Sequence, residues 1–104
     1  MDEKKNEIIL FDNQGVKLEV NLQDETVWLT QEQMAQLFEK DRTVIGRHIN
    51  NIFNEKELNK ESNVQKMHIP NSDKPVTFYN LDVIISVGYR VKSQNVVIFR
   101  RWAT

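Results

Sequence analysis

The chain has 104 residues, enough for one domain with a single core and too few for two. With 39% hydrophobic and 28% charged residues, its composition is that of a folded globular protein rather than a disordered one. It has no cysteine and no apolar run of bilayer-spanning length, and its charged N-terminus predicts no secretory signal. We therefore expect one cytoplasmic domain over residues 1–104, without disulfides, thiolate metal sites or a membrane segment.

The net charge of −1 conceals an uneven distribution of charge along the chain. Residues 1–39 contain three basic and nine acidic residues, a net charge of −6. Residues 40–104 contain eleven basic and six acidic residues, a net charge of +5. Because binding to nucleic acid depends on cations that face phosphates, such contacts are expected from the second part of the chain.

The acidic part begins with a predicted antiparallel β-meander over residues 7–29. Residues 16–22 alternate between apolar and polar side chains, which is typical of a half-buried strand. The connection before this run contains Gly15, so a hairpin with residues 8–11 is expected. Residues 26–29 are β-prone and follow a polar turn, which predicts a third strand.

Two short amphipathic helices joined by a tight polar turn are predicted over residues 30–53, and this pattern is typical of a helix-turn-helix. Thr30 is the expected N-cap of the first helix, and Gln33 completes a capping-box pattern. Asp41 is the expected N-cap of the second helix. Glu39 lies in the turn, where a glycine is common and where an acidic side chain does not help to bind phosphate.

The second helix carries the face that we expect to read DNA. Its apolar residues form a single stripe, which leaves the opposite side polar. Arginine can contact guanine with two hydrogen bonds, asparagine can do the same with adenine, and threonine can contact a thymine methyl group. The expected base-contacting residues are Thr43, Arg47, Asn50 and Asn51. Gly46 would allow a DNA backbone or sugar to approach closely, and Lys40 and Arg42 are expected at phosphates.

A β-hairpin is predicted within residues 64–79, directly after the second helix, in the position of the wing of a winged helix. Two β-prone runs, residues 64–69 and 76–79, flank a polar loop there. Lys66 and Lys74 would add phosphate contacts from this wing.

The C-terminal part is predicted to be helical. Residues 80–92 are apolar nearly all round, which predicts a buried helix. Residues 99–104 resemble the first turns of another helix that is cut off, so we expect the chain to be a fragment of a longer protein. Tyr89 and Trp102 could stack on a nucleic acid, but we expect both to be core residues.

Catalytic and metal-binding patterns are missing from the sequence. His48 and His68 are the only histidines, and without cysteines or a matched carboxylate spacing they do not predict a zinc site. The chain has no glycine-rich phosphate loop and no spacing that suggests a nucleophile paired with a base. We therefore expect no enzyme activity, no metal, no cofactor and no small-molecule substrate.

Several segments together resemble the RhuM family of bacterial virulence-associated proteins. They are Trp28-Leu29-Thr30-Gln31, Met34-Ala35-x-Leu37-Phe38, Ile45-x-x-His48-Ile49-x-x-Ile52-Phe53, residues 79–91 and Phe99-Arg100-x-Trp102-Ala103-Thr104. The likeness extends from about Gly15 to the end, and residues 80–91 are its most specific part. It implies a winged-helix-like DNA-binding module, found in mobile or pathogenicity-island DNA and sometimes attached to a Fic/Doc-type domain. It also implies a longer helical region after Thr104, and residues 95–98 depart from the family in being apolar.

The sequence thus predicts an α+β domain with a β-meander, a helix-turn-helix, a wing and a buried helix. Its expected function is sequence-specific, regulatory binding of double-stranded DNA, with the second helix in the major groove. Such a module commonly pairs on two half-sites, so a homodimer is expected. The alternative is a protein-interaction module that positions an attached effector domain and depends on an apolar surface near residues 96–98.

Overall fold

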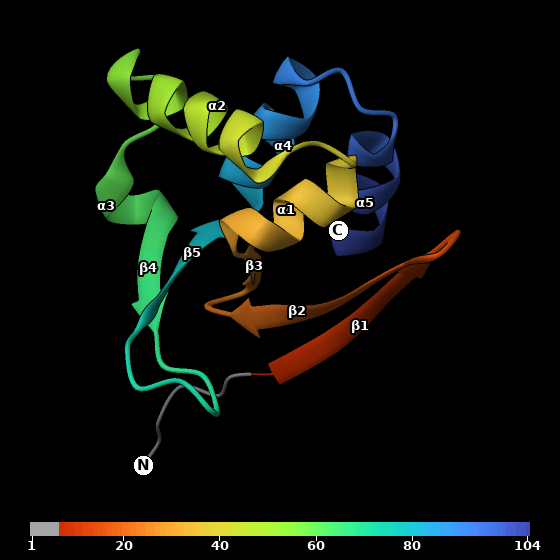
Figure 1. Cartoon of the computed structure of the whole chain (residues 1–104), viewed down its shortest axis with the longest axis vertical. Helices are drawn as coiled ribbons and strands as arrows, with labels where there is room; N and C mark the ends of the chain where they lie inside the picture. The colour runs from red at the N-terminus through yellow and green to blue at the C-terminus, as the bar shows by residue number, and fades with distance from the viewer. Residues whose placement is uncertain (1–6) are drawn as a thin grey trace.

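The computed structural model describes residues 7–104 as an α+β fold in which one five-stranded antiparallel sheet packs against helices (Figure 1). The sheet has the order β1-β2-β3-β5-β4. The strands are β1 Glu7–Asn13, β2 Val16–Gln23, β3 Thr26–Leu29, β4 Val64–Met67 and β5 Val76–Asn80. The predicted fold class and the three strands predicted at the N-terminal end are confirmed. The prediction of no secretory signal rests largely on residues 1–6, which lie outside the described residues.

The two helices predicted within residues 30–53 are present, and three more follow. The helices are α1 Gln31–Phe38, α2 Arg42–Asn54, α3 Lys60–Asn63, α4 Leu81–Arg90 and α5 Asn95–Ala103. The last helix begins four residues before the predicted start at Phe99, because Val96 joins Phe99 in the core and extends its buried side. Within residues 7–104, every helix is too short or too polar to cross a bilayer.

The predicted hairpin after α2 is present, but it is part of the main sheet rather than a separate arm. β5 pairs with β4 on one side and with β3 on the other, where Trp28 lies opposite Asn80 and Leu29 opposite Tyr79. The hairpin and the meander therefore form one continuous sheet. The first hairpin strand ends at Met67, two residues earlier than predicted.

The predicted buried helix, α4, is buried along one side only. Its Val83, Ile84 and Val87 are fully inaccessible to solvent, and all three belong to the main core between the sheet and the helices. Tyr89 on the same helix is 51% exposed. The prediction that Tyr89 is a core residue was therefore wrong, because the side chain projects from the side of α4 that faces solvent.

An aromatic cluster joins α5 to the first strand. Phe11 of β1 contacts Phe99 and Trp102 of α5, with ring centroids 5.2 Å apart in both pairs and edge-on geometry. Phe99 is fully buried, and Trp102 is half-buried against the core. The prediction that Trp102 packs in the core was correct, and this cluster packs α5 against β1 near its end at the β1–β2 turn.

Both predicted N-cap residues lie at the N-cap positions of their helices, and one of them makes the capping hydrogen bonds. At α1, the Gln33 backbone N–H donates to Thr30 Oγ1 at 3.1 Å, and the Thr30 backbone N–H donates to Gln33 Oε1 at 3.0 Å, which confirms the capping box. At α2, Asp41 occupies the N-cap position without accepting a backbone hydrogen bond from the helix. The predicted N-cap position is therefore confirmed, while the carboxylate accepts from the Thr43 hydroxyl at 3.5 Å instead of from the helix backbone.

Candidate nucleic-acid interface

Helix α2 has one side in the core and the opposite side in solvent. Ile45, Ile49 and Ile52 are at most 3% exposed and anchor the helix. The residues of α2 that are exposed to solvent are Arg42, Thr43, Arg47, Asn50 and Asn54. Asn51 is half-buried at the edge between the two sides. Three of the four expected base-contacting residues, Thr43, Arg47 and Asn50, therefore share one accessible surface.

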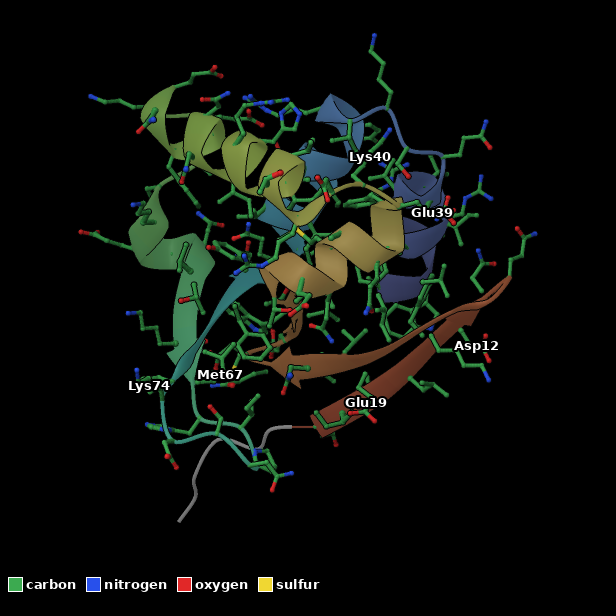
Figure 2. All side chains as sticks on the ribbon, in the orientation of Figure 1. Asp12, Glu19, Glu39, Lys40, Met67 and Lys74 are labelled. Atoms are coloured by element: carbon green, nitrogen blue, oxygen red, sulfur yellow. The ribbon has the colours of Figure 1, made fainter. Side chains whose placement is uncertain are left out.

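The turn between α1 and α2 exposes both of its charged residues, Glu39 and Lys40 (Figure 2). Glu39 has a φ of 57° and lies in the left-handed region, the conformation for which a glycine is common at the end of a helix. The backbone N–H of Lys40 donates to the Ala35 carbonyl at 3.0 Å, which ends α1. The side chain of Lys40 is exposed at the turn.

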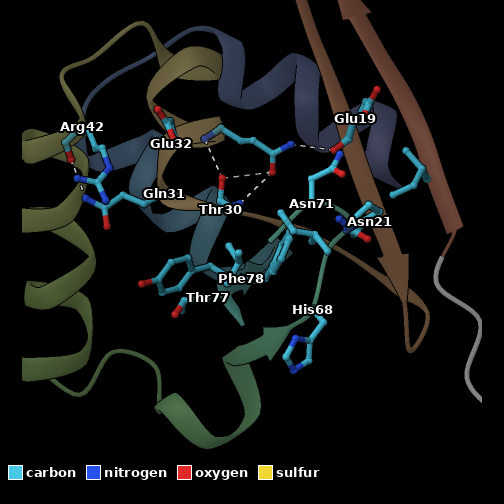
Figure 3. Close-up of a pocket in the computed structure, with 16 residues that line it drawn as sticks. Glu19, Asn21, Thr30, Gln31, Glu32, Arg42, His68, Asn71, Thr77 and Phe78 are labelled. Atoms are coloured by element: carbon cyan, nitrogen blue, oxygen red, sulfur yellow. Dashed lines mark hydrogen bonds between the residues drawn. The ribbon is translucent and has the colours of Figure 1, made fainter. Parts of the chain in front are cut away.

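The side chain of Gln31 in α1 packs against Gly46, in the space that a DNA backbone or sugar was expected to occupy. A Cβ atom added to Gly46 would lie 2.6 Å from Nε2 of Gln31. That same nitrogen donates to the Arg42 carbonyl of α2 at 2.9 Å (Figure 3). Sequence reasoning assigned the space over Gly46 to DNA, whereas in the structure it accommodates the contact between α1 and α2.

A groove with a volume of about 1000 Å³ lies beside the start of α2 and the β4–β5 hairpin (Figure 3). Gln31, Arg42 and Thr77 are among its lining residues. Lys66 lies opposite Thr77 across the hairpin, and residues directly opposite each other share one face of a sheet. Lys66 therefore shares a hairpin face with Thr77, although it is not itself among the lining residues of the groove. Lys74 lies in the loop between the two strands and does not line the groove (Figure 2).

His48 is half-buried beside the exposed side of α2. Burial lowers the pKa of His48 below its ordinary value, and the positive charges of Arg47 and Arg90 lower this pKa further. Its Nδ1 atom is buried and has no hydrogen-bond partner within the described part of the chain. His48 is therefore a neutral neighbour of Arg47 at neutral pH and adds no charge to the interface.

An ion-pair network connects α4 to the segment that follows α2. Nη2 of Arg90 donates to Glu55 at 2.8 Å and to Glu57 at 2.7 Å. The Ser86 hydroxyl donates to the other carboxylate oxygen of Glu57 at 2.6 Å. The hydrogen bonds from Ser86 and Arg90 lower the pKa of Glu57. The C-terminal end of α2 is thus held in place from outside the core as well as from within it.

A model described as the virulence protein RhuM family matches residues 51–104, slightly more than half of the chain. The chain belongs to the RhuM family. The resemblance stated from the sequence is confirmed, and the family is one of virulence proteins. No curated protein and no solved structure matches this RhuM-family chain.

The matched part of the RhuM-family chain runs from the last turn of α2 to the end of α5. It includes Asn51, Asn54, Lys66 and Lys74, whereas Arg42, Thr43, Arg47 and Asn50 precede it. It also begins later than Gly15, where the resemblance was placed. The family match therefore covers the hairpin, α4 and α5 but only the last turn of α2. Any role of the exposed side of α2 has to be argued from the structure of that helix.

Sequence reasoning missed three residues that hold this surface of the RhuM-family chain in place. Gln31 packs over Gly46, while Arg90 and Glu57 join α4 to the end of α2. The helical pattern around Gln31 indicated only a capped first turn, and no local signal relates Glu57 to a residue 33 positions away. In residues 7–104, no three His, Asp or Glu side chains come together as metal ligands.

Proposed function

We propose that this chain binds double-stranded DNA, with α1 and α2 acting as a helix-turn-helix and the β4–β5 hairpin as a wing. The observation that carries the proposal is the exposed side of α2, which bears Thr43, Arg47 and Asn50 opposite a buried isoleucine stripe. Arg47 and Asn50 make no side-chain hydrogen bond or ion pair within residues 7–104. Their donors are therefore available to base edges in the major groove.

The phosphate contacts in this proposal come from four cations around that surface. They are Lys40, Arg42, Lys66 and Lys74, all exposed. Across the described residues, none of the four side chains is engaged in an ion pair. Cations free of internal partners can release counterions from DNA without first breaking a contact in the protein. Arg42 lines the groove, and Lys66 shares a hairpin face with Thr77, which also lines it; a phosphate strand between the first turn of α2 and the hairpin would lie near both cations.

A protein-interaction module is the rival proposal, and it requires an apolar surface near residues 96–98. Val96 is 2% exposed, and only Val97 and Ile98 reach solvent, at 37% and 39%. Two exposed aliphatic side chains form a small patch, which lies beside the exposed arginines of α5. The polar side of α2 offers several side-chain donors without internal partners, whereas the aliphatic patch on α5 consists of only two side chains. We therefore propose DNA as the partner.

The test is selection of binding sites from a random pool of DNA duplexes, followed by titration of variants at several salt concentrations. We expect Arg47→Ala to lose about 1–3 kcal/mol of discrimination at one base pair. We expect Lys66→Ala to weaken binding evenly across sequences and to reduce the salt slope by about one unit.

Arg101→Ala is the matched control, because Arg101 is exposed on α5 and has no part in the proposed contacts. It should leave both discrimination and salt slope unchanged. Binding that does not weaken with salt, or no enriched sequence in the pool, contradicts the proposal. If Arg47→Glu binds its partner normally while Ile98→Glu does not, the protein-interaction module is supported instead.

A further inference from the structure

The sheet ends in two edge strands of very different character. β4 has four residues, carries the exposed Lys66 and is soon followed by Pro70, all of which discourage pairing with another chain. β1, from Glu7 to Asn13, contains neither lysine nor proline. Its pairing with β2 is unbroken over all seven residues, so no bulge twists it out of line. Its outer backbone N–H and C=O groups therefore form a regular template for another strand.

The side chains of β1 are also unusually apolar for an exposed edge. Ile8, Ile9 and Leu10 are 56%, 37% and 58% exposed. These three account for half of the exposed large hydrophobic side chains in the described part of the chain. An accessible backbone edge and accessible aliphatic side chains thus coincide on one strand, and an added strand would cover both at once.

We propose that a second copy of this chain pairs with β1, antiparallel about a twofold axis at Ile9. In that register Ile8 lies opposite Leu10 of the second copy, and Ile9 lies opposite its counterpart. Aliphatic side chains then face each other on both faces of the joined sheet. Each Glu7 then lies opposite Phe11 of the other copy, at the two ends of the pairing. A twofold axis at Leu10 would instead set Ile8 opposite Asp12 and Ile9 opposite the buried Phe11, so only Leu10 would keep an exposed aliphatic partner.

Charge also favours this register. The two copies of Glu7 lie four residues apart along the paired strands, roughly 14 Å at the strand rise of about 3.4 Å. That distance exceeds the Debye length of about 8 Å at physiological salt, so their repulsion is largely screened. The axis is perpendicular to the sheet, so both copies keep their helices on the same side and the contact closes as a dimer.

Cysteine cross-linking tests this dimer directly, because the chain has no cysteine of its own. Opposed residues of antiparallel strands have Cα atoms about 4.5–5.5 Å apart, which suits a disulfide. Ile9→Cys should form a disulfide dimer under mild oxidation about tenfold faster than Ile98→Cys, because the paired thiols are already neighbours. Ile98 is the matched control, since it is 39% exposed and lies on α5.

Two further cross-linking experiments test the register of the pairing and the role of the β1 edge. A mixture of Ile8→Cys and Leu10→Cys chains should cross-link faster than either variant alone, because only the mixture places two thiols opposite each other. Leu10→Lys added to Ile9→Cys should slow cross-linking, with thermal unfolding confirming that the variant remains folded. Equal rates for Ile9→Cys and Ile98→Cys, or no effect of Leu10→Lys, would overturn the dimer. No DNA is present, so the outcome is independent of the proposed function.

Discussion

At the scale of single residues, Gly46 allows one side chain of α1 to pack against α2. Glycine inside a helix costs about 0.5–1 kcal/mol relative to alanine. An alanine there would displace the Gln31 amide, 2.6 Å from the new Cβ, and break its hydrogen bond to the Arg42 carbonyl. That bond is worth about 0.5–1.5 kcal/mol, so the gain and the loss nearly cancel.

We therefore expect Gly46→Ala to change the free energy of unfolding by less than about 1 kcal/mol in the wild-type background. In a Gln31→Ala background there is no amide for the new Cβ to displace, so Gly46→Ala should raise the free energy of unfolding by up to about 1 kcal/mol. Urea unfolding of the four proteins in this double-mutant cycle measures the coupling. If Gly46→Ala has the same effect on stability in both backgrounds, contact with Gln31 is not the reason that glycine occupies position 46.

At the scale of elements, the orientation of α2 relative to α4 is supported by Arg90 with Glu55 and Glu57. These side chains are partly exposed, so the network is expected to be worth only about 1 kcal/mol. Glu57→Gln should cost more stability than Glu55→Gln, because Glu57 also accepts the Ser86 hydroxyl. The pKa of Glu57 is lowered in the folded state, so its contribution is present above its unfolded pKa and is lost as pH falls through the folded value.

The measurement for this network is urea unfolding of wild type, Glu55→Gln and Glu57→Gln at neutral and acidic pH. The advantage of wild type over Glu57→Gln should be largest near pH 7 and should be lost as pH falls through the lowered folded pKa of Glu57. An advantage that stays constant across this range would mean that the carboxylate charge of Glu57 does not contribute.

At the scale of the whole molecule, α5 packs against the first strand through Phe99, Phe11 and Trp102. Phe99 is fully buried, and Phe99→Ala should destabilise the fold by about 3–5 kcal/mol. That is a large part of the roughly 5–15 kcal/mol of a domain of this size. Ile98→Ala, at the exposed neighbouring position, should change stability by less than about 0.5 kcal/mol. Thermal and urea unfolding compare the two, and equal effects would mean that the aromatic cluster is not part of the cooperative core.

The residues of the proposed interface were predictable to different degrees. The spacing of Ile45, Ile49 and Ile52 predicted which side of α2 is buried, because a helix repeats every 3.6 residues whatever surrounds it. The role of Gly46 was not predictable, because it depends on Gln31, fifteen positions earlier, and the geometry of a helix crossing. The exposure of Tyr89 was missed because an apolar sequence does not say which sides of α4 find partners.

Local patterns in the sequence were sufficient for the strands, the two central helices, the capping box at Thr30 and the family. These features depend on residues close together in the chain, so periodicity and capping chemistry specify them. The tertiary structure alone decided that the hairpin joins the meander in one sheet, that Arg42 of α2 and Thr77 of the hairpin line the same groove, and that β1 is an open edge. Such features arise from packing between segments far apart in the chain, and no short stretch of sequence encodes the energy of those contacts.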